Sequence, residues 1–73
     1  MLENKTNVFA KNLKEQRVIN HMTQRQVAEV LGISQPSYIR YENGTAEPTL
    51  ENLVRLADLF DVSIDYLCGR KEY

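Results

Sequence analysis

Residues 23–44 read TQRQVAEVLGISQPSYIRYENG, and this stretch decides the fold. Its apolar residues recur at spacings of three and four, which indicates helices rather than strands. Thr23 and Gln26 form a capping box, in which each side chain satisfies a backbone N–H group at the start of a helix. Gly32 ends that helix, because glycine accepts the left-handed conformation that a helix end needs. The stretch therefore predicts two short helices joined by a tight turn that contains glycine.

The second helix of this pair has two possible N-caps. If Ser34 is the cap, its hydroxyl bonds the amide of Ser37, and Pro36 lies at the second helical position, where its missing N–H costs nothing. If Gln35 is the cap, Pro36 comes first, since proline pushes the preceding residue away from helical angles. We expect the Ser34 cap, and the choice decides whether Gln35 points outward or holds the helix end. Gly44 ends this helix.

Another helix is predicted before this pair, over residues 7–20. Thr6 or Asn7 can cap its start, and Asn20 is expected to take the left-handed conformation in the turn that follows. The stripe that faces inward consists of Phe9, Leu13 and Arg17, with Ala10 beside it.

Two more helices are predicted after the pair. One follows the N-cap Thr49, and a last short turn runs from Ser63 to Gly69. Glycine and proline occur only at helix boundaries or in a first turn, so the local signals agree with one another. We therefore expect an all-α fold, one compact five-helix domain that spans residues 1–73 with its core at about 7–67. The apolar side of the fourth helix is expected to consist of Leu50, Leu53, Val54, Ala57 and Phe60.

Length and residue usage exclude several classes of protein. A chain of 73 residues holds one domain, and a single cysteine, Cys68, excludes an internal disulfide. No apolar run is long enough to cross a membrane, and residues 1–10 lack the apolar stretch of a signal peptide. We therefore expect a cytoplasmic location and no membrane partner. One histidine, one cysteine and no clustered carboxylates provide no site for catalysis, a metal, a cofactor or a small ligand, so an enzyme is not expected.

The charge of the chain is divided between its two halves. The net charge of −1 argues against a general binder of polyanions. Residues 1–40, however, carry six basic and three acidic groups, whereas residues 41–73 carry three basic and seven acidic groups. This asymmetry predicts a basic face and an acidic face.

The order of several features is typical of one family. Thr23-Gln24 opens a helix, Ala28, Gly32 and Ile33 follow at fixed spacing, Glu-Asn-Gly ends the next helix, and PTLENLVRLADLFDVSIDYL follows. From about Phe9 to Leu67 the sequence resembles the Cro and phage-repressor type of helix-turn-helix, also called the xenobiotic-response-element family. The resemblance implies a five-helix domain like that of lambda repressor, which binds operator DNA, commonly as a dimer, with residues 34–43 in the major groove.

The resemblance also suggests which residues read bases. With Tyr38 and Tyr41 facing inward, the outer side of the second helix of the pair is left for DNA. Glutamine can pair with adenine and arginine with guanine, while isoleucine or a proline ring can contact a thymine methyl group. The predicted base-reading residues are Gln35, Pro36, Ser37, Ile39 and Arg40.

A second set of residues is expected to contact DNA phosphates. A helix N-terminus favours an anion, and phosphate contacts position a protein without reading sequence. The resemblance implies phosphate contacts by Gln24 and Asn43, and it implies that Arg17 pairs with Glu42 as part of the scaffold. The full predicted set of phosphate contacts is Thr23, Gln24, Arg25, Ser34 and Asn43.

Three features depart from the family pattern. Asn20 and His21 occupy the turn before Thr23, which usually carries glycine. Glu47 lies in the loop after Gly44, where many relatives carry basic residues, and its charge would repel DNA. Tyr38 and Tyr41 occupy positions usually taken by smaller aliphatic residues. Each phenol hydroxyl therefore needs a partner, and one of them could reach a phosphate.

The sequence favours a sequence-specific transcriptional regulator, most simply a repressor. Its expected partner is double-stranded DNA, bound by a homodimer, with residues 62–73 as the expected contact between copies. The alternative is a protein-interaction module of the same fold, such as an antitoxin-like or adaptor partner. The acidic isoelectric point near 5.7 and Glu47 favour this alternative slightly.

Overall fold

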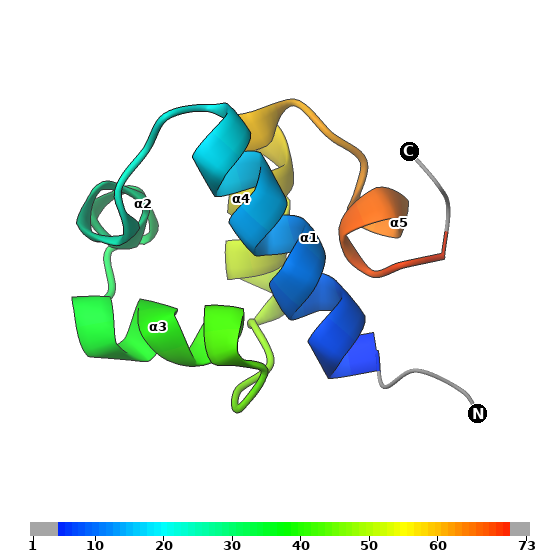
Figure 1. Ribbon diagram of the computed structural model, residues 1–73, viewed down its shortest axis with the longest axis horizontal. Coiled ribbons are helices and arrows are strands. Elements are labelled where there is room, and N and C mark those ends of the chain that lie inside the picture. The colour runs from blue at the N-terminus through cyan, green and yellow to red at the C-terminus, as the bar shows by residue number, and fades with distance from the viewer. Residues whose placement is uncertain (1–4, 71–73) are drawn as a thin grey trace.

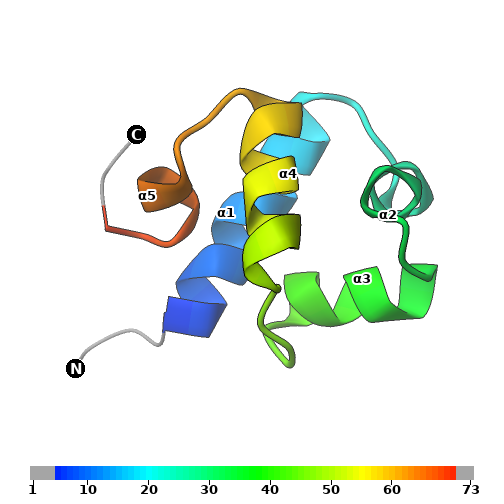
Figure 2. The same cartoon turned by 180° about the vertical axis from the view of Figure 1, so that it is seen from behind.

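The computed structural model describes residues 5–70, which form five helices and no strand. The predicted all-α fold is therefore confirmed. Figure 1 shows α2 and α3 on one side of α1 and α5 on the other, with α4 behind α1, and Figure 2, the view from behind, shows α4 in front. No helix in this range is long and apolar enough to cross a membrane. The helices are α1 (Lys5–Ile19), α2 (Gln24–Leu31), α3 (Gln35–Asn43), α4 (Leu50–Phe60) and α5 (Ile64–Leu67).

Each helix after the first begins at a hydroxyl-bearing N-cap. The amide of Gln26 donates to the Thr23 hydroxyl at 3.0 Å, and the Gln26 side chain accepts from the Thr23 amide at 2.8 Å. This confirms the predicted capping box. Thr49 and Ser63 cap α4 and α5 in the same way. A cap of this kind stabilises a helix by about 1 kcal/mol, so these residues fix where the short helices start.

The start of α1 differs from the expectation. The helix begins at Lys5, so Thr6 and Asn7 lie inside it and neither is its N-cap. Asn7 instead packs against the C-terminal end of α3. A Cβ atom added at Gly44, where φ is 76°, would lie 2.6 Å from the Asn7 Oδ1 atom. The backbone conformation at Gly44 therefore favours glycine, and a side chain there would also have to displace the Asn7 side chain.

The turn between α1 and α2 also differs in one residue. His21 takes the left-handed conformation, with φ 58°, rather than Asn20. Asn20 donates its side-chain amide to the Gln16 carbonyl at 2.7 Å, which ties it to the last turn of α1. The chain therefore reverses one residue later than predicted.

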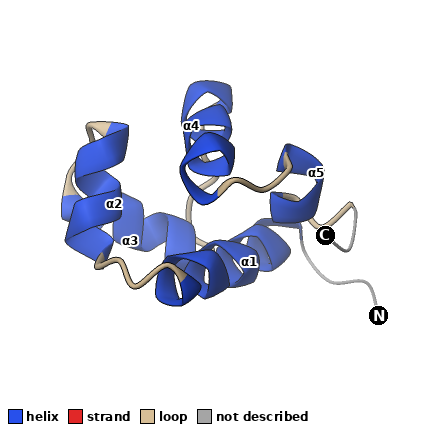
Figure 3. Ribbon diagram, turned by 90° about the horizontal axis from the view of Figure 1, so that it is seen from above, coloured by secondary structure: helices blue, strands red, loops and turns tan. Residues whose placement is uncertain are grey.

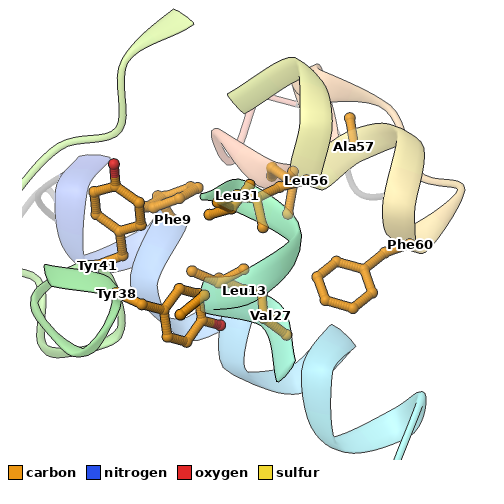
Figure 4. Packing of buried hydrophobic residues seen from close by; sticks show 11 residues of the cluster. Phe9, Leu13, Val27, Leu31, Tyr38, Tyr41, Leu56, Ala57 and Phe60 are labelled. Carbon is orange, nitrogen blue, oxygen red and sulfur yellow. The ribbon is translucent and has the colours of Figure 1, made fainter. Parts of the chain in front are cut away.

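The core lies at the centre of the ring of helices that Figure 3 shows from above. Phe9 and Tyr41 meet edge to face with ring centroids 6.2 Å apart, and so do Tyr38 and Tyr41. Such aromatic pairs contribute about 0.5–1.5 kcal/mol beyond the area they bury. They join α1 to α3. The buried cluster consists of Phe9, Leu13, Val27, Ala28, Leu31, Tyr38, Tyr41, Leu56, Ala57, Phe60 and Leu67 (Figure 4).

The buried side of α4 is rotated from the predicted one. Ala57 and Phe60 are buried and Leu53 packs against the core, as predicted. Leu50 and Val54, however, are 74% and 40% exposed, whereas Leu56 and Asn52 are buried. Asn52 donates its Nδ2 group to the Tyr41 hydroxyl at 3.1 Å. The helical period allows two neighbouring stripes on this helix, one through Val54 and one through Leu56. The hydrogen bond from the Asn52 amide to the Tyr41 phenol allows the stripe that includes Asn52 to be buried. Apolar periodicity alone does not predict this stripe, because Asn52 is polar.

The helix α5 is held against α1 by polar contacts and one buried residue. Asn12 donates its side-chain amide to the Tyr66 carbonyl at 2.9 Å, and Gln16 donates to the Tyr66 hydroxyl at 3.3 Å. Leu67 is fully buried between them and the core. The short last helix therefore forms part of the same domain.

Candidate functional site

The turn between α2 and α3 has the predicted geometry. Gly32 has φ 71°, and its N–H group bonds the carbonyls of Ala28 and Glu29. The N–H group of Ile33 also bonds the Ala28 carbonyl, at 3.1 Å, and the Ile33 side chain packs against the core. The turn therefore fixes how α3 is presented relative to α2.

Ser34 is the N-cap of α3, as expected. The amide of Ser37 donates to the Ser34 hydroxyl at 3.2 Å, and that hydroxyl donates to the Ser37 hydroxyl at 3.0 Å. Pro36 lies in the first turn, after Gln35, where no intrahelical hydrogen bond is lost. Gln35 is thus the first helical residue rather than the cap. Both serines are exposed, but the capping bond already uses the Ser34 hydroxyl as acceptor and donor.

Two tyrosines hold α3 by its inner face. Tyr38 is fully buried and Tyr41 is 7% exposed. The Tyr38 hydroxyl donates to the Glu42 carboxylate at 2.5 Å, and the Tyr41 hydroxyl accepts from Asn52. Both hydroxyls therefore have the partners they need inside the domain, and neither requires a phosphate.

The outer face of α3 carries the predicted base-reading residues. Pro36, Ser37 and Arg40 are exposed, whereas Gln35 and Ile39 are half-buried. The inner face of α3 therefore packs against the core, and its outer face leaves three of the predicted base-reading residues accessible to solvent. The two half-buried residues are four positions apart and therefore border this face along one side.

A shallow, open hollow of about 530 Å³ lies between the start of α2 and the start of α3. It brings together four residues that were predicted to contact DNA, and two arginines lie on its wall. Guanidinium and amide groups donate hydrogen bonds, and the N-terminus of α2 adds unpaired backbone N–H groups. The hollow is therefore suited to an anion. Its lining consists of Arg17, Met22, Thr23, Gln24, Arg25 and Gln35.

The Glu42 carboxylate joins α1, α2 and α3 beside this hollow. Arg17 donates from Nε to Oε2 at 2.6 Å and from Nη2 to Oε1 at 3.1 Å. Gln24 donates from Nε2 to Oε1 at 3.2 Å. Tyr38 completes the set with its hydroxyl on Oε2. The Arg17 and Glu42 side chains are only 14% and 3% exposed, so the implied ion pair is present and nearly buried.

These hydrogen bonds set the charge states of the cluster. Burial by itself raises the pKa of Glu42, but hydrogen bonds from Arg17, Tyr38 and Gln24 outweigh burial, and the pKa lies below its ordinary value. The hydrogen bond to Glu42 raises the pKa of Arg17, and burial raises the pKa of Tyr38. The cluster therefore holds one carboxylate and one guanidinium, both charged at neutral pH.

The other end of α3 has a different character. Asn43, a predicted phosphate contact, is exposed in the last turn of α3. Glu47, in the loop that follows, accepts a hydrogen bond from the Thr6 hydroxyl at 3.0 Å. This bond places the acidic side chain at the start of α1, so the hollow and Glu47 lie at opposite ends of α3.

Sequence reasoning missed two bonds of the cluster. For the Tyr38 hydroxyl a partner was expected but not named, and Gln24 was predicted only to contact a phosphate, yet both donate to Glu42. The spacing of four residues from Tyr38 to Glu42 places them on one side of a helix and could have indicated the first bond. The second joins different helices, and no local pattern marks it.

Comparisons with known proteins agree with this geometry. The model of the helix-turn-helix family matches residues 13–67. The crystal structure of a transcriptional regulator from Listeria innocua superposes with a TM-score of 0.80 at 36% identity, over 84% of this chain and 57% of that one. The similarity therefore includes all five helices in part or in full.

Two curated relatives show how the chain compares with longer proteins. The cryptic phage CTXphi transcriptional repressor RstR of Vibrio cholerae is 52% identical over 58 residues, 80% of this chain and 52% of that protein. Antitoxin PezA of Streptococcus pneumoniae is 38% identical over 62 residues, 85% of this chain and 39% of that protein. The chain thus spans about half the length, or less, of these relatives.

Proposed function

The chain belongs to the helix-turn-helix family, and from this premise we propose that it is a DNA-binding transcriptional regulator that acts as a repressor. In this proposal α3 lies in the major groove of double-stranded DNA, and the hollow beside it receives a backbone phosphate. The similarity to a named phage repressor supports the direction of regulation.

One observation carries the proposal, namely that an exposed helix face lies next to an anion-receptive hollow. Arg40 and Pro36 are exposed on α3, while Gln24 and Arg25 line the hollow at the start of α2. A protein that reads DNA needs both parts, because phosphate contacts set the register and base contacts supply specificity. Gln35 belongs to both, since it lines the hollow and begins α3.

The predicted contacts take these roles in the proposal. Arg40 reads guanine and Gln35 reads adenine, while Pro36 and Ile39 offer apolar contact to a thymine methyl group and Ser37 lies beside them. Gln24 and Arg25 bind phosphate from the hollow, and Asn43 binds phosphate at the other end of α3. Thr23 and Ser34 use their hydroxyls as caps, so their contribution is to direct the first N–H groups of α2 and α3.

Two copies are proposed to bind together, with half-sites about 34 Å apart along the duplex. The expected contact, residues 62–73, includes residues 71–73, which lie outside the described residues. In the described part, Ile64 is 36% exposed on α5. Ile19 is 64% exposed and borders an open groove of about 670 Å³ that Val62 and Tyr66 also line. This groove is the surface proposed for the contact.

Selection of bound sequences from a pool of random duplexes tests the proposal directly. We expect enrichment of one sequence with two related half-sites. The logarithm of the binding constant should fall linearly with the logarithm of the salt concentration, with a slope of about −0.9 for each phosphate neutralised. A pool that yields no enriched sequence at low salt would contradict the proposal.

A substitution on α3 sharpens this test. Arg40→Ala is expected to weaken binding to the selected sequence by about 1–3 kcal/mol and to relax preference at one base pair. Arg55→Ala, which removes an arginine from α4, is the matched control and should leave affinity unchanged. Equal weakening on every duplex sequence would make Arg40 a phosphate contact instead.

A second candidate function is an antitoxin-like interaction module, which the similarity to antitoxin PezA favours. In this alternative the same fold binds a protein partner. The duplex selection distinguishes the two, because a module that only binds protein enriches no DNA sequence.

A further inference from the structure

The Glu42 carboxylate has all four of its acceptor positions occupied. A carboxylate offers about four lone-pair sites. Oε2 accepts from the Arg17 Nε group at 2.6 Å and from the Tyr38 hydroxyl at 2.5 Å. Oε1 accepts from the Arg17 Nη2 group at 3.1 Å and from the Gln24 Nε2 group at 3.2 Å. The position of this nearly buried carboxylate is therefore fixed from three helices.

The Gln24 bond is the weakest member of the set. At 3.2 Å it is the longest of the four, and Gln24 is the donor that lines the hollow at the protein surface. The Gln24 amide nitrogen carries two N–H groups, and Glu42 occupies one of them. The bond therefore holds the side chain in place and leaves the second N–H group for an anion in the hollow.

We infer that Tyr38 is a positioning residue for phosphate binding, which acts on Gln24 through Glu42. This inference rests on the proposed function, because it assigns a phosphate to the hollow. The Tyr38 hydroxyl fills one acceptor site of Oε2 and so prevents the carboxylate from drawing another donor there. Without this hydroxyl one acceptor site of the buried Oε2 atom is left without a donor. Gln24, the least constrained donor, then shifts toward that site or is replaced by water.

A second tyrosine on the same helix provides a matched control. Tyr41 is also buried, also carries a hydrogen-bonded hydroxyl, and also changes to phenylalanine by the loss of one oxygen atom. Its partner is Asn52 on α4, which takes no part in the Glu42 cluster. A difference between the two variants in DNA binding therefore reports the cluster rather than the loss of a buried hydroxyl.

The test is a double-mutant cycle measured on a random-sequence duplex of 20 base pairs at low salt, with the folded state of each variant checked by thermal unfolding. Tyr38→Phe is expected to weaken binding by about 2- to 10-fold, the range for losing the immobilisation of one long side chain. Gln24→Ala should weaken binding at least as much. In the double variant the Tyr38→Phe change should add nothing, and Tyr41→Phe should leave affinity unchanged.

Three outcomes overturn the inference. Additive losses in the double variant make Tyr38 a general packing residue. Tighter binding by Tyr38→Phe shows that Glu42 competes with DNA for Gln24. No loss from Gln24→Ala removes the phosphate contact on which the inference depends. Failure of the unaltered protein to bind any duplex instead contradicts the proposed function, so the two failures are distinguishable.

If Tyr38→Phe does not fold, the unaltered protein supplies a second measurement. The two Gln24 side-chain amide protons resolve in any glutamine because rotation about the C–N bond is slow, so the informative quantity is which of them moves. Added duplex should shift mainly the proton that does not face Glu42, and equal shifts of both protons overturn the inference.

Discussion

Two buried polar clusters fix α3, and they differ in charge and in what lies next to them. Glu42 with Arg17, Gln24 and Tyr38 is ionic and borders the hollow at the surface. The pair of Tyr41 and Asn52 is neutral and lies between α3 and α4. The helix α3 is thus anchored at two places. The neutral bond only fixes its packing against α4, whereas the charged network also positions side chains of the candidate site.

Removing the arginine of the charged cluster should have the largest effect. Arg17→Met strands a nearly buried carboxylate, so the free energy of unfolding should fall by about 3–5 kcal/mol in urea denaturation. The double variant Arg17→Met with Glu42→Leu should recover much of this loss, since no buried charge is then left unpaired. A loss below about 1 kcal/mol for Arg17→Met would show that the carboxylate escapes to solvent.

The neutral pair should respond less. Tyr41→Phe leaves the Asn52 amide without its acceptor, which should lower the free energy of unfolding by about 1–3 kcal/mol. Asn52→Leu, which restores an apolar stripe on α4, should be nearer to neutral in the Tyr41→Phe background. If Tyr41→Phe cost as much as Arg17→Met, the distinction between the two clusters would not hold.

Acid should separate the clusters further. The pKa of Glu42 is lowered in the folded state, so its contribution to stability is complete above the unfolded value of about 4.3 and is lost as the pH falls through the lowered pKa. Each unit of lowering corresponds to about 1.4 kcal/mol. Urea midpoints measured from pH 6 to pH 2 should therefore fall less steeply for Glu42→Gln. Equal slopes would contradict the assigned pKa direction.

An exposed ion pair provides the smallest expected effect. Arg55 and Glu51 are four residues apart on α4, with side chains 48% and 71% exposed. Arg55→Ala should change the free energy of unfolding by at most about 0.5 kcal/mol, because solvent screens the pair. Arg17→Met also removes one arginine from one ion pair. The difference between the losses of unfolding free energy in the two variants therefore measures how much burial increases the cost of breaking an ion pair. A loss of several kcal/mol would show that the Arg55 contact with the Leu31 carbonyl also matters.

Local signals predicted where most helices begin and end. Thr23, Ser34 and Thr49 cap the helices that they were expected to cap, because a hydroxyl one residue before a helix acts through nearby backbone groups alone. The turn after α1 is an exception that is itself local, since it involves a bond over only four residues. Asn20 bonds back to α1, so His21 takes the left-handed conformation.

The candidate site was predictable to a different degree. The helical period identified the inner face of α3, and the family resemblance implied the pair of Arg17 and Glu42. The hollow was not predictable, because it needs the relative positions of α1, α2 and α3. The two misplaced residues of α4, Leu50 and Val54, have a similar origin, since the buried side turns toward Asn52, which is polar and bonds a phenol from another helix.

The division of α3 into two faces has a consequence for how this domain can diverge. Pro36, Arg40 and Asn43 are exposed, and substitutions at such positions usually change stability by less than about 0.5 kcal/mol. The inner tyrosines and Glu42 carry the folding of the helix instead. If the proposed function holds, recognition and folding are carried by different residues of the same nine-residue helix. Evolution or protein design can therefore substitute the outer residues of α3 to change the DNA sequence that is bound, while the packed residues stay the same.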